Sequence, residues 1–223
     1  MKNINAYCED KFYSSFLENP IYAEIQKDYD KVFWGKNRTD WKLWDMTPRQ
    51  LLGETRSTEF DMTSLYYMSF LLEKNPDTIY DLGCGWNIFK KYIRKIYGID
   101  PHSMYADSRE TIDDKWLSAR KGTLNSVMSI CALHFTPLEA MKKRVVNFAS
   151  LLQTGGRGYL SLNLQRMIER STVDEFKNSD FDFDGYVRNE LEDIPFKYLV
   201  FDVDFSYGKD TGIDGNIRLV VEK

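Results

Sequence analysis

The stretch that decides the fold is residues 79–87, which read IYDLGCGWN. An apolar pair runs into Asp81, and Gly83 and Gly85 follow with one residue between them. A short apolar run closed by glycines is typical of a strand and the turn that ends it. Glycine there permits positive φ and lets a ligand approach the backbone closely. The stretch therefore predicts a strand over residues 78–82 that delivers the chain to a binding site.

Working outward from this stretch, short apolar runs alternate with helical periods along most of the chain. Residues 136–139, Thr-Pro-Leu-Glu, predict a helix start with a capping box, and Gly155-Gly156 predict the end of that helix. The expected strands are residues 78–82, 96–100, 126–132, 159–164, 198–205 and 217–221, and the expected helices are 63–73, 86–95, 138–152 and 186–192.

This alternation predicts an α/β fold with a doubly wound, mostly parallel sheet, closed by an antiparallel C-terminal hairpin. Residues 1–75 are aromatic and helical in pattern, with three tryptophans in residues 34–44. We expect them to form an N-terminal helical extension that acts as a lid, and residues 76–223 to form the Rossmann-like domain. The tryptophans fit two roles equally well: stacking on a base or covering a bound ligand, and packing of the N-terminal helices on the core.

Acids at two strand ends indicate a nucleoside cofactor. Asp100 ends the second strand 19 positions after Asp81, a spacing at which a carboxylate accepts ribose hydroxyls. A dinucleotide fingerprint requires a third glycine, but Ile88 stands at that position. A cofactor that carries an amino-acid tail in place of phosphates would use Asp81 to hold its ammonium group.

Four ordered motifs resemble those of the class I S-adenosylmethionine-dependent methyltransferases. Residues 81–85, DLGCG, are similar to motif I of that family, and residues 98–101, GIDP, to its second strand with the ribose-binding acid. Residues 129–135, SICALHF, resemble its fourth strand and following loop, and residues 151–159, LLQTGGRGY, the approach to its fifth strand. The final hairpin resembles the family's reversed last pair of strands.

The resemblance implies a fold, a cofactor and a set of binding residues. It implies methyl transfer from S-adenosylmethionine, with the ribose on Asp100 and the adenine amino group on Asp107. Arg56 is a candidate partner of the cofactor carboxylate, although an exposed surface arginine is the more common reading. The full set of candidate cofactor-binding residues is Arg56, Asp81, Gly83, Cys84, Gly85, Asp100, Pro101, Asp107, Ile130, Cys131 and Ala132.

The sequence departs from the family pattern in two places. Asn87 stands where a further glycine often follows in motif I. Only about 25 residues separate Asp100 from the expected fourth strand, which is short for a helix, a strand and a second helix. We therefore expect one element in this interval to be lost or shortened, and with it the environment of Asp107 to change.

The catalytic chemistry leaves few residues to single out. A sulfonium cofactor already carries a good leaving group, so positioning supplies much of the rate and a base is needed only for a protonated acceptor. His134 is a weak candidate for that base; a role in shaping its loop is more common. The sparse cysteines lack the spacing of a metal site or a disulfide framework.

Composition excludes some broad classes and leaves others open. A net charge of -4 does not indicate binding of nucleic acid over the whole surface, and no run approaches the ~20 apolar residues of a membrane span. We expect a cytoplasmic protein with a small-molecule acceptor somewhat favoured over RNA or protein. A non-catalytic cofactor-binding or macromolecule-binding module is the main alternative, and an NAD-dependent oxidoreductase is a weaker one.

Overall fold

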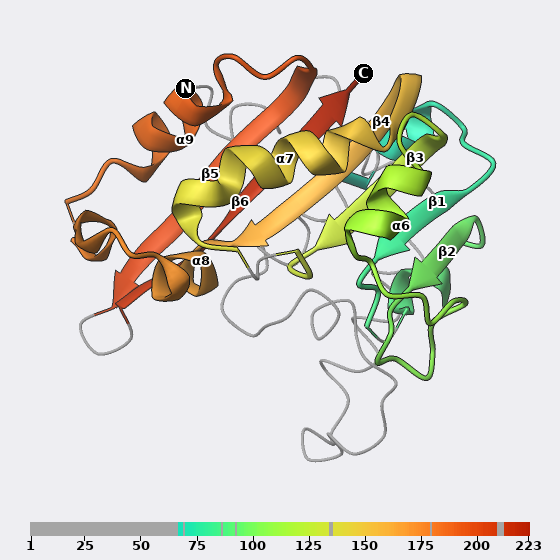
Figure 1. Cartoon of the computed structure of the whole chain (residues 1–223), viewed down its shortest axis with the longest axis horizontal. Coiled ribbons are helices and arrows are strands. Elements are labelled where there is room, and N and C mark those ends of the chain that lie inside the picture. Colours follow the sequence, from blue (N-terminus) through green and yellow to red (C-terminus); the bar gives the residue numbers. More distant parts are fainter. Residues whose placement is uncertain are drawn as a thin grey trace, which may run out of the picture.

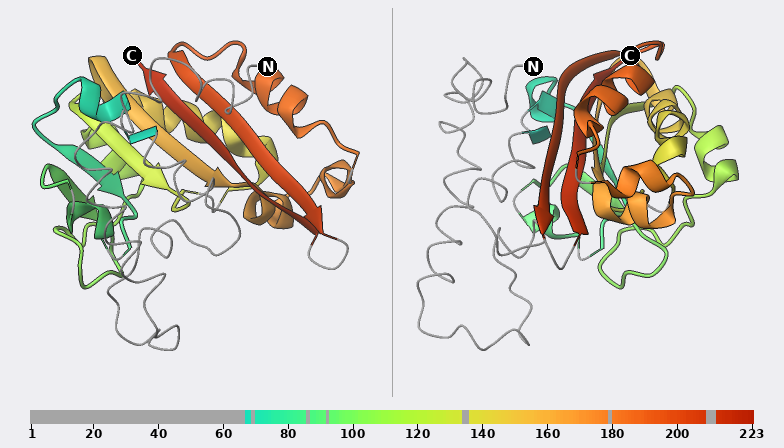
Figure 2. Two further views of the ribbon diagram at one scale, coloured as in Figure 1. Left: turned by 180° about the vertical axis from the view of Figure 1, so that it is seen from behind. Right: turned by 90° about the vertical axis from the view of Figure 1, so that its left-hand side faces the viewer.

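The computed structural model describes residues 67–68, 70–85, 87–91, 93–133, 136–178, 180–208 and 212–223. These residues form a six-stranded sheet in the order β2-β1-β3-β4-β6-β5. Helices α6 to α9 lie over one face of that sheet (Figures 1 and 2). The strands are β1 (Ile79–Leu82), β2 (Ile96–Ile99), β3 (Leu124–Ile130), β4 (Leu152–Asn163), β5 (Lys197–Gly208) and β6 (Gly212–Glu222).

The sheet has the expected direction of strands. Strands β2, β1, β3 and β4 run parallel, and β6 pairs antiparallel with both β4 and β5. The predicted α/β class, with its mostly parallel sheet and reversed C-terminal hairpin, is confirmed. Its strand order and reversed hairpin are those of the class I methyltransferase-like fold that the motifs predict.

One large core fills the space between the sheet and the helices on its covered face. It joins β1, β3, β4 and β6 to α7 (Met141–Ser150), α8 (Leu164–Arg170) and α9 (Phe183–Leu191). Alternation along β4 and β6 sends Leu160, Leu162, Ile217 and Leu219 into this core, in agreement with their pairing in register. Burial of such side chains contributes roughly 25 cal/mol per Å² and positions the strand ends.

The described residues before β1 contact the sheet through Tyr67 and Arg157. The Tyr67 and Tyr159 rings stack with centroids 5.0 Å apart. The Arg157 guanidinium donates to the Phe70 carbonyl at 2.9 Å and to the Glu73 and Glu222 carboxylates at 2.6 Å each. Tyr67, Phe70 and Glu73 are therefore held against β4, whereas residues 1–66 and 69 of the predicted extension lie outside the described part of the chain.

The predicted helices are wrong in three details. Among the described residues of 86–95, the helical segment is the short 3-10 helix η1 (Ile88–Lys91) in place of the predicted α-helix. The helix predicted to begin with a capping box starts with η2 (Leu138–Ala140), whose N-cap residue is Pro137 and provides no side-chain cap. The Glu139 carboxylate accepts from the Thr172 backbone N–H and hydroxyl. Gly155 and Gly156 lie within β4, since α7 ends at Ser150 and the strand begins at Leu152.

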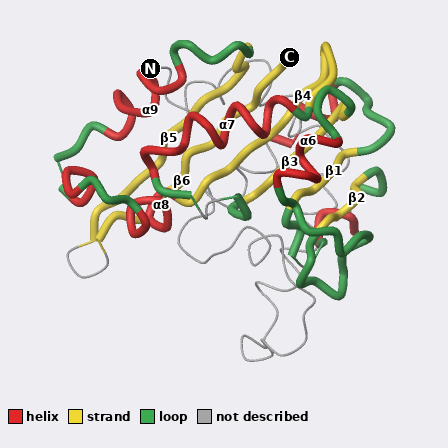
Figure 3. The backbone as a smooth tube through the Cα atoms, viewed as in Figure 1, coloured by secondary structure: helices red, strands yellow, loops and turns green. Residues whose placement is uncertain are grey.

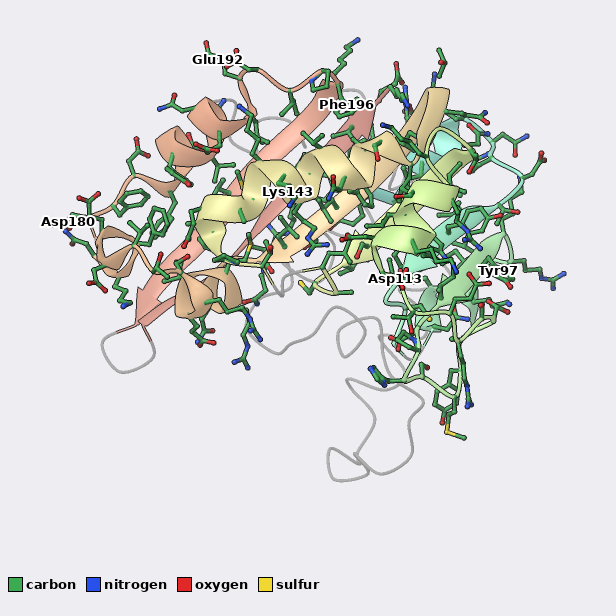
Figure 4. The ribbon with its side chains drawn as sticks, viewed as in Figure 1. Tyr97, Asp113, Lys143, Asp180, Glu192 and Phe196 are labelled. Atoms are coloured by element: carbon green, nitrogen blue, oxygen red, sulfur yellow. The ribbon has the colours of Figure 1, made fainter. Side chains whose placement is uncertain are left out.

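The interval between β2 and β3 is shortened, as the sequence predicted. It holds a long loop and one helix of six residues, α6 (Asp114–Ala119), which Figure 3 shows after a continuous loop segment. A third strand is represented only by a single parallel bridge between Ile99 and Ser108. Figure 4 labels Tyr97 on the edge strand β2 and Asp113 at the end of this loop. None of the described helices has the length and apolar character needed to cross a membrane.

Candidate functional site

The candidate site lies where the carboxyl ends of β1, β2 and β3 meet. These strands are neighbours, with Asp81 of β1 opposite Gly98 of β2 and Met128 of β3. The chain leaves β1 toward β2 on one side, whereas β3 lies on the other side, so β1 and β3 flank the point at which the order of winding reverses. Ligands of doubly wound sheets bind at such a point.

Gly83 opens the loop after β1 in a conformation that other residues rarely adopt. Its φ is +73°, and a Cβ at this position would lie 2.2 Å from the Cβ of Ala132. Its N–H donates to the Ile99 carbonyl at 2.7 Å, which joins the loop to the end of β2. The loops after β1 and β3 therefore approach so closely that the first requires glycine.

Gly85 and Asp100 join the loop after β1 to the turn after β2. The Gly85 N–H donates to Asp100 Oδ2 at 3.0 Å, and Asp100 Oδ1 accepts from His102 and Ser103 N–H groups at 2.8 and 3.2 Å. Among the described residues, a Cβ on Gly85 would meet no atom within 4 Å, so this part of the chain leaves open space at Gly85. A carboxylate has about four acceptor positions, and three are used here. Pro101, next in sequence, is half-buried within the same turn.

Three carboxylates make the site electronegative. Asp81 is 3% exposed, and its burial, with the nearby charge of Asp100, raises its pKa to about 7. Burial raises the pKa of the Cys84 thiol to about 12, and the charges of Asp81, Asp100 and Asp107 add to the effect. Because Asp107 is paired with Lys90, the negative charge available to a ligand comes from Asp100 and from Asp81 in its ionised form, and this charge favours a cationic ligand group over a phosphate.

Asp107, the candidate adenine acceptor, is already engaged in the structure. One oxygen accepts from Gly98 N–H at 2.9 Å and Asn87 Nδ2 at 3.0 Å, and the other pairs with Lys90. Desolvation alone would raise the pKa of this carboxyl, but the hydrogen bonds from Lys90, Gly98 and Asn87 outweigh it and lower the pKa below its usual range. The sequence singled out Asn87 as a departure but did not reveal these side-chain contacts.

The residues after β3 face two ways. Ala132 packs toward Gly83, whereas the Cys131 Sγ lies 3.3 Å from Asn216 Oδ1 and 3.7 Å from Ser161 Oγ, on the side of β4 and β6. Burial raises the pKa of the Cys131 thiol, in agreement with a packing role. Ile130 is half-buried at the end of β3. Among the predicted residues, Arg56 and His134 lie outside the described part of the chain.

Sequence reasoning missed a buried polar strip on β6. Asn216 and Arg218 are 4% and 2% exposed, opposite Asn163 and Ser161 of β4. The signal was available, because they alternate with apolar residues 217, 219 and 221 and so share one face of the strand. Within the described ranges, no group of three or more His, Cys, Asp or Glu side chains could hold a metal ion.

Comparisons with known proteins give structural similarities alone. No protein-family model matches the sequence, and no curated protein does. A SAM-dependent methyltransferase from Archaeoglobus fulgidus is similar at 11% identity and a TM-score of 0.45, over 75% of this chain and 95% of that one. TehB from Haemophilus influenzae is similar at 14% identity and a TM-score of 0.48, over 70% of this chain and 61% of that one.

A third similar structure is 1,6-didemethyltoxoflavin-N1-methyltransferase from Burkholderia thailandensis, which contains 1,6-didemethyltoxoflavin and S-adenosylhomocysteine. It is 10% identical with a TM-score of 0.46, over 95% of this chain and 89% of that one. Because these identities and TM-scores are low, the fold assignment rests on the strand order and the site on its own geometry.

Proposed function

We propose that the protein binds S-adenosylmethionine at the carboxyl ends of β1, β2 and β3 and transfers its methyl group to an acceptor. The observation that carries this proposal is that two carboxylates create a negative field at the adjoining carboxyl ends of β1 and β2: Asp81, which is buried, and Asp100, which accepts from the Gly85 N–H. S-adenosylmethionine carries a sulfonium and an ammonium group, so this field favours it. A nicotinamide dinucleotide brings a pyrophosphate, which the same field disfavours.

The residues fit the parts of this cofactor. Asp81, buried at the end of β1, would hold the ammonium group, and the pairing would return its carboxyl to the charged form. Asp100 keeps about one acceptor position for a ribose hydroxyl, beside the open space at Gly85. Ile130 and Ala132 would line the far side of the cofactor, with Cys131 contributing its backbone because its thiol packs against Ser161 and Asn216.

The adenine is assigned differently from the family pattern. The two Asp107 oxygens already accept hydrogen bonds from Gly98, Asn87 and Lys90. We therefore propose that Asp107 supports the site and does not accept from the adenine amino group. The bound cofactor supplies an electrophilic methyl group with a neutral thioether as its leaving group. The chain's own contribution is then to orient the two reactants and to exclude water.

The acceptor is proposed by class only. The net charge of -4 favours a small molecule over an RNA, whose phosphates an acidic surface would repel. A second candidate function is cofactor binding without catalysis, which the reduced third strand and the engaged Asp107 favour. His134 remains a weak candidate base, and Arg56 a candidate partner of the cofactor carboxylate.

Calorimetric titration tests the proposal. We expect micromolar binding of S-adenosylmethionine and S-adenosylhomocysteine to the full chain and no measurable binding of NADH. Asp81→Asn should weaken the binding of both, whereas Asp174→Asn, an exposed aspartate remote in sequence that pairs with Lys177, should leave it unchanged. Binding of NADH with no binding of the sulfonium cofactor would refute the proposal. Binding without turnover on any small-molecule pool would favour the non-catalytic function.

A further inference from the structure

We infer that Asn87 is a positioning residue which, together with Lys90 and Asp107, forms a clamp that holds the Gly85–Asp100 pair in place for a ribose. This inference rests on the proposed function, because it assigns the ribose to Asp100. The clamp consists of the Asn87, Lys90 and Asp107 side chains and their contacts with Gly98 and the Tyr105 carbonyl.

The first observation is that asparagine at position 87 is energetically unfavourable in two respects. Its φ is +52°, a left-handed conformation that glycine adopts freely and asparagine tolerates. Its side chain is 7% exposed, and within the described residues its Oδ1 has no hydrogen-bond partner. A glycine would avoid both costs, so the contacts made by the Nδ2 group have to compensate for them.

The second observation is what the Nδ2 group joins. It donates to the Tyr105 carbonyl and to Asp107 Oδ2, both at 3.0 Å, and so ties the loop after β1 to the segment after β2. These two segments are the ones that meet at the Gly85–Asp100 hydrogen bond. Because the amide links the same two segments through separate hydrogen bonds, it restrains their separation.

The third observation is that the missing side chain of Gly98 makes room for the Asn87 amide group. A Cβ on Gly98 would lie 2.6 to 2.7 Å from the atoms of the Asn87 amide group. The Gly98 N–H and carbonyl are in turn bonded to the Asp107 carboxylate and to the Asp107 and Ser108 N–H groups. The clamp therefore takes over the pairing that a complete third strand would give to β2, and it holds Asp100 at the end of β2.

Asn87→Gly removes the amide and keeps a backbone that suits φ of +52°. The measurement is the affinity of the full chain for S-adenosylhomocysteine and for its 2′,3′-dideoxy analogue. We expect Asn87→Gly to lose about tenfold toward the first ligand and less than about twofold toward the second, because the analogue makes no hydroxyl contact with Asp100. Equal losses toward both ligands, or no loss toward either, would overturn the inference.

Amide hydrogen exchange tests the clamp without a ligand. The His102 and Ser103 N–H groups are bonded to Asp100, so releasing the clamp should speed their exchange about tenfold in Asn87→Gly and in Asp107→Asn. Asp174→Asn is the matched control, and its exchange should equal that of the wild type. Unchanged exchange at residues 100–105 in both clamp variants would overturn the inference even if one variant folds poorly.

The two experiments separate the inference from the proposed function. Faster exchange in the variants, with no binding of S-adenosylhomocysteine to the wild type, would refute the proposed function and with it the assignment of the clamp to a ribose. Wild-type binding with equal losses toward both ligands would leave the proposed function standing and refute the positioning role of Asn87.

Discussion

Gly83→Ala tests the close approach between the loops after β1 and β3. The new methyl group would meet the Ala132 Cβ at 2.2 Å, and the backbone at φ +73° would be strained. The backbone strain costs about 1–2 kcal/mol, and overpacking costs about 1–3 kcal/mol. The expected loss in the free energy of unfolding is therefore about 2–5 kcal/mol, a large part of the roughly 5–15 kcal/mol of a typical domain.

Gly85→Ala and Gly155→Ala are the matched controls. Both glycines have positive φ, at +53° and +76°, and a Cβ on either would meet no atom of the described residues within 4 Å. Each should lose only the backbone term of about 1–2 kcal/mol. The entropy that alanine removes from the unfolded chain is common to all three variants and cancels in the comparison.

Urea denaturation with linear extrapolation measures the three variants. Gly83→Ala should be less stable than Gly85→Ala by about 1–3 kcal/mol, and adding Ala132→Gly should recover most of that difference because it removes the facing methyl group. Equal stabilities for Gly83→Ala and Gly85→Ala, or no recovery in the double variant, would refute the reasoning that the two loops are in contact here.

Three further predictions concern charged groups. The Asp81 pKa of about 7 lies above its unfolded value of about 3.9, so the stabilisation by its protonated form is present below about pH 4 and lost as the pH rises through 7. Asp81→Asn should thus leave unfolding at pH 4 nearly unchanged and stabilise the protein at pH 8.5 by up to roughly 4 kcal/mol; equal effects at both pH values would contradict this. Asp100→Ala should abolish calorimetric binding of S-adenosylmethionine, and unchanged affinity would exclude the ribose assignment. Arg157→Met removes bonds to Glu73, Glu222 and the Phe70 carbonyl, so its urea midpoint should fall by an amount equivalent to about 1–3 kcal/mol.

The strands of the sheet could be predicted from the sequence because their pattern is local. Short apolar runs located β1, β2 and β3 to within two residues, the first two ended by an acid and the third recognised as a continuous apolar run. The helices were less predictable. The basic segment after Gly85 has helical periodicity, but its described residues form the short 3-10 helix η1. The Glu139 side chain contacts Thr172, a residue far along the chain. Contacts of that kind leave no periodic signal.

The candidate site was predictable in position and not in detail. Asp81, Gly83, Gly85 and Asp100 follow strands that the topology makes neighbours, so their proximity follows from the strand order. The engagement of Asp107 did not follow, because it depends on the Asn87 amide and on how the shortened segment folds back over Gly98. A residue type and a spacing cannot distinguish a carboxylate that awaits a ligand from one that already has its partners.

The single bridge at Ser108 has a consequence for association between molecules. An outermost strand normally presents a row of unsatisfied backbone groups, which can recruit a strand from another chain. At Gly98 of β2 the Asp107 carboxylate and the backbone of 107–108 occupy those groups. The sheet can therefore end at β2 without a complete third strand and still discourage pairing with another molecule at Gly98. Here the Asp107 segment takes the place of a strand partner and so protects this point of the edge against aggregation.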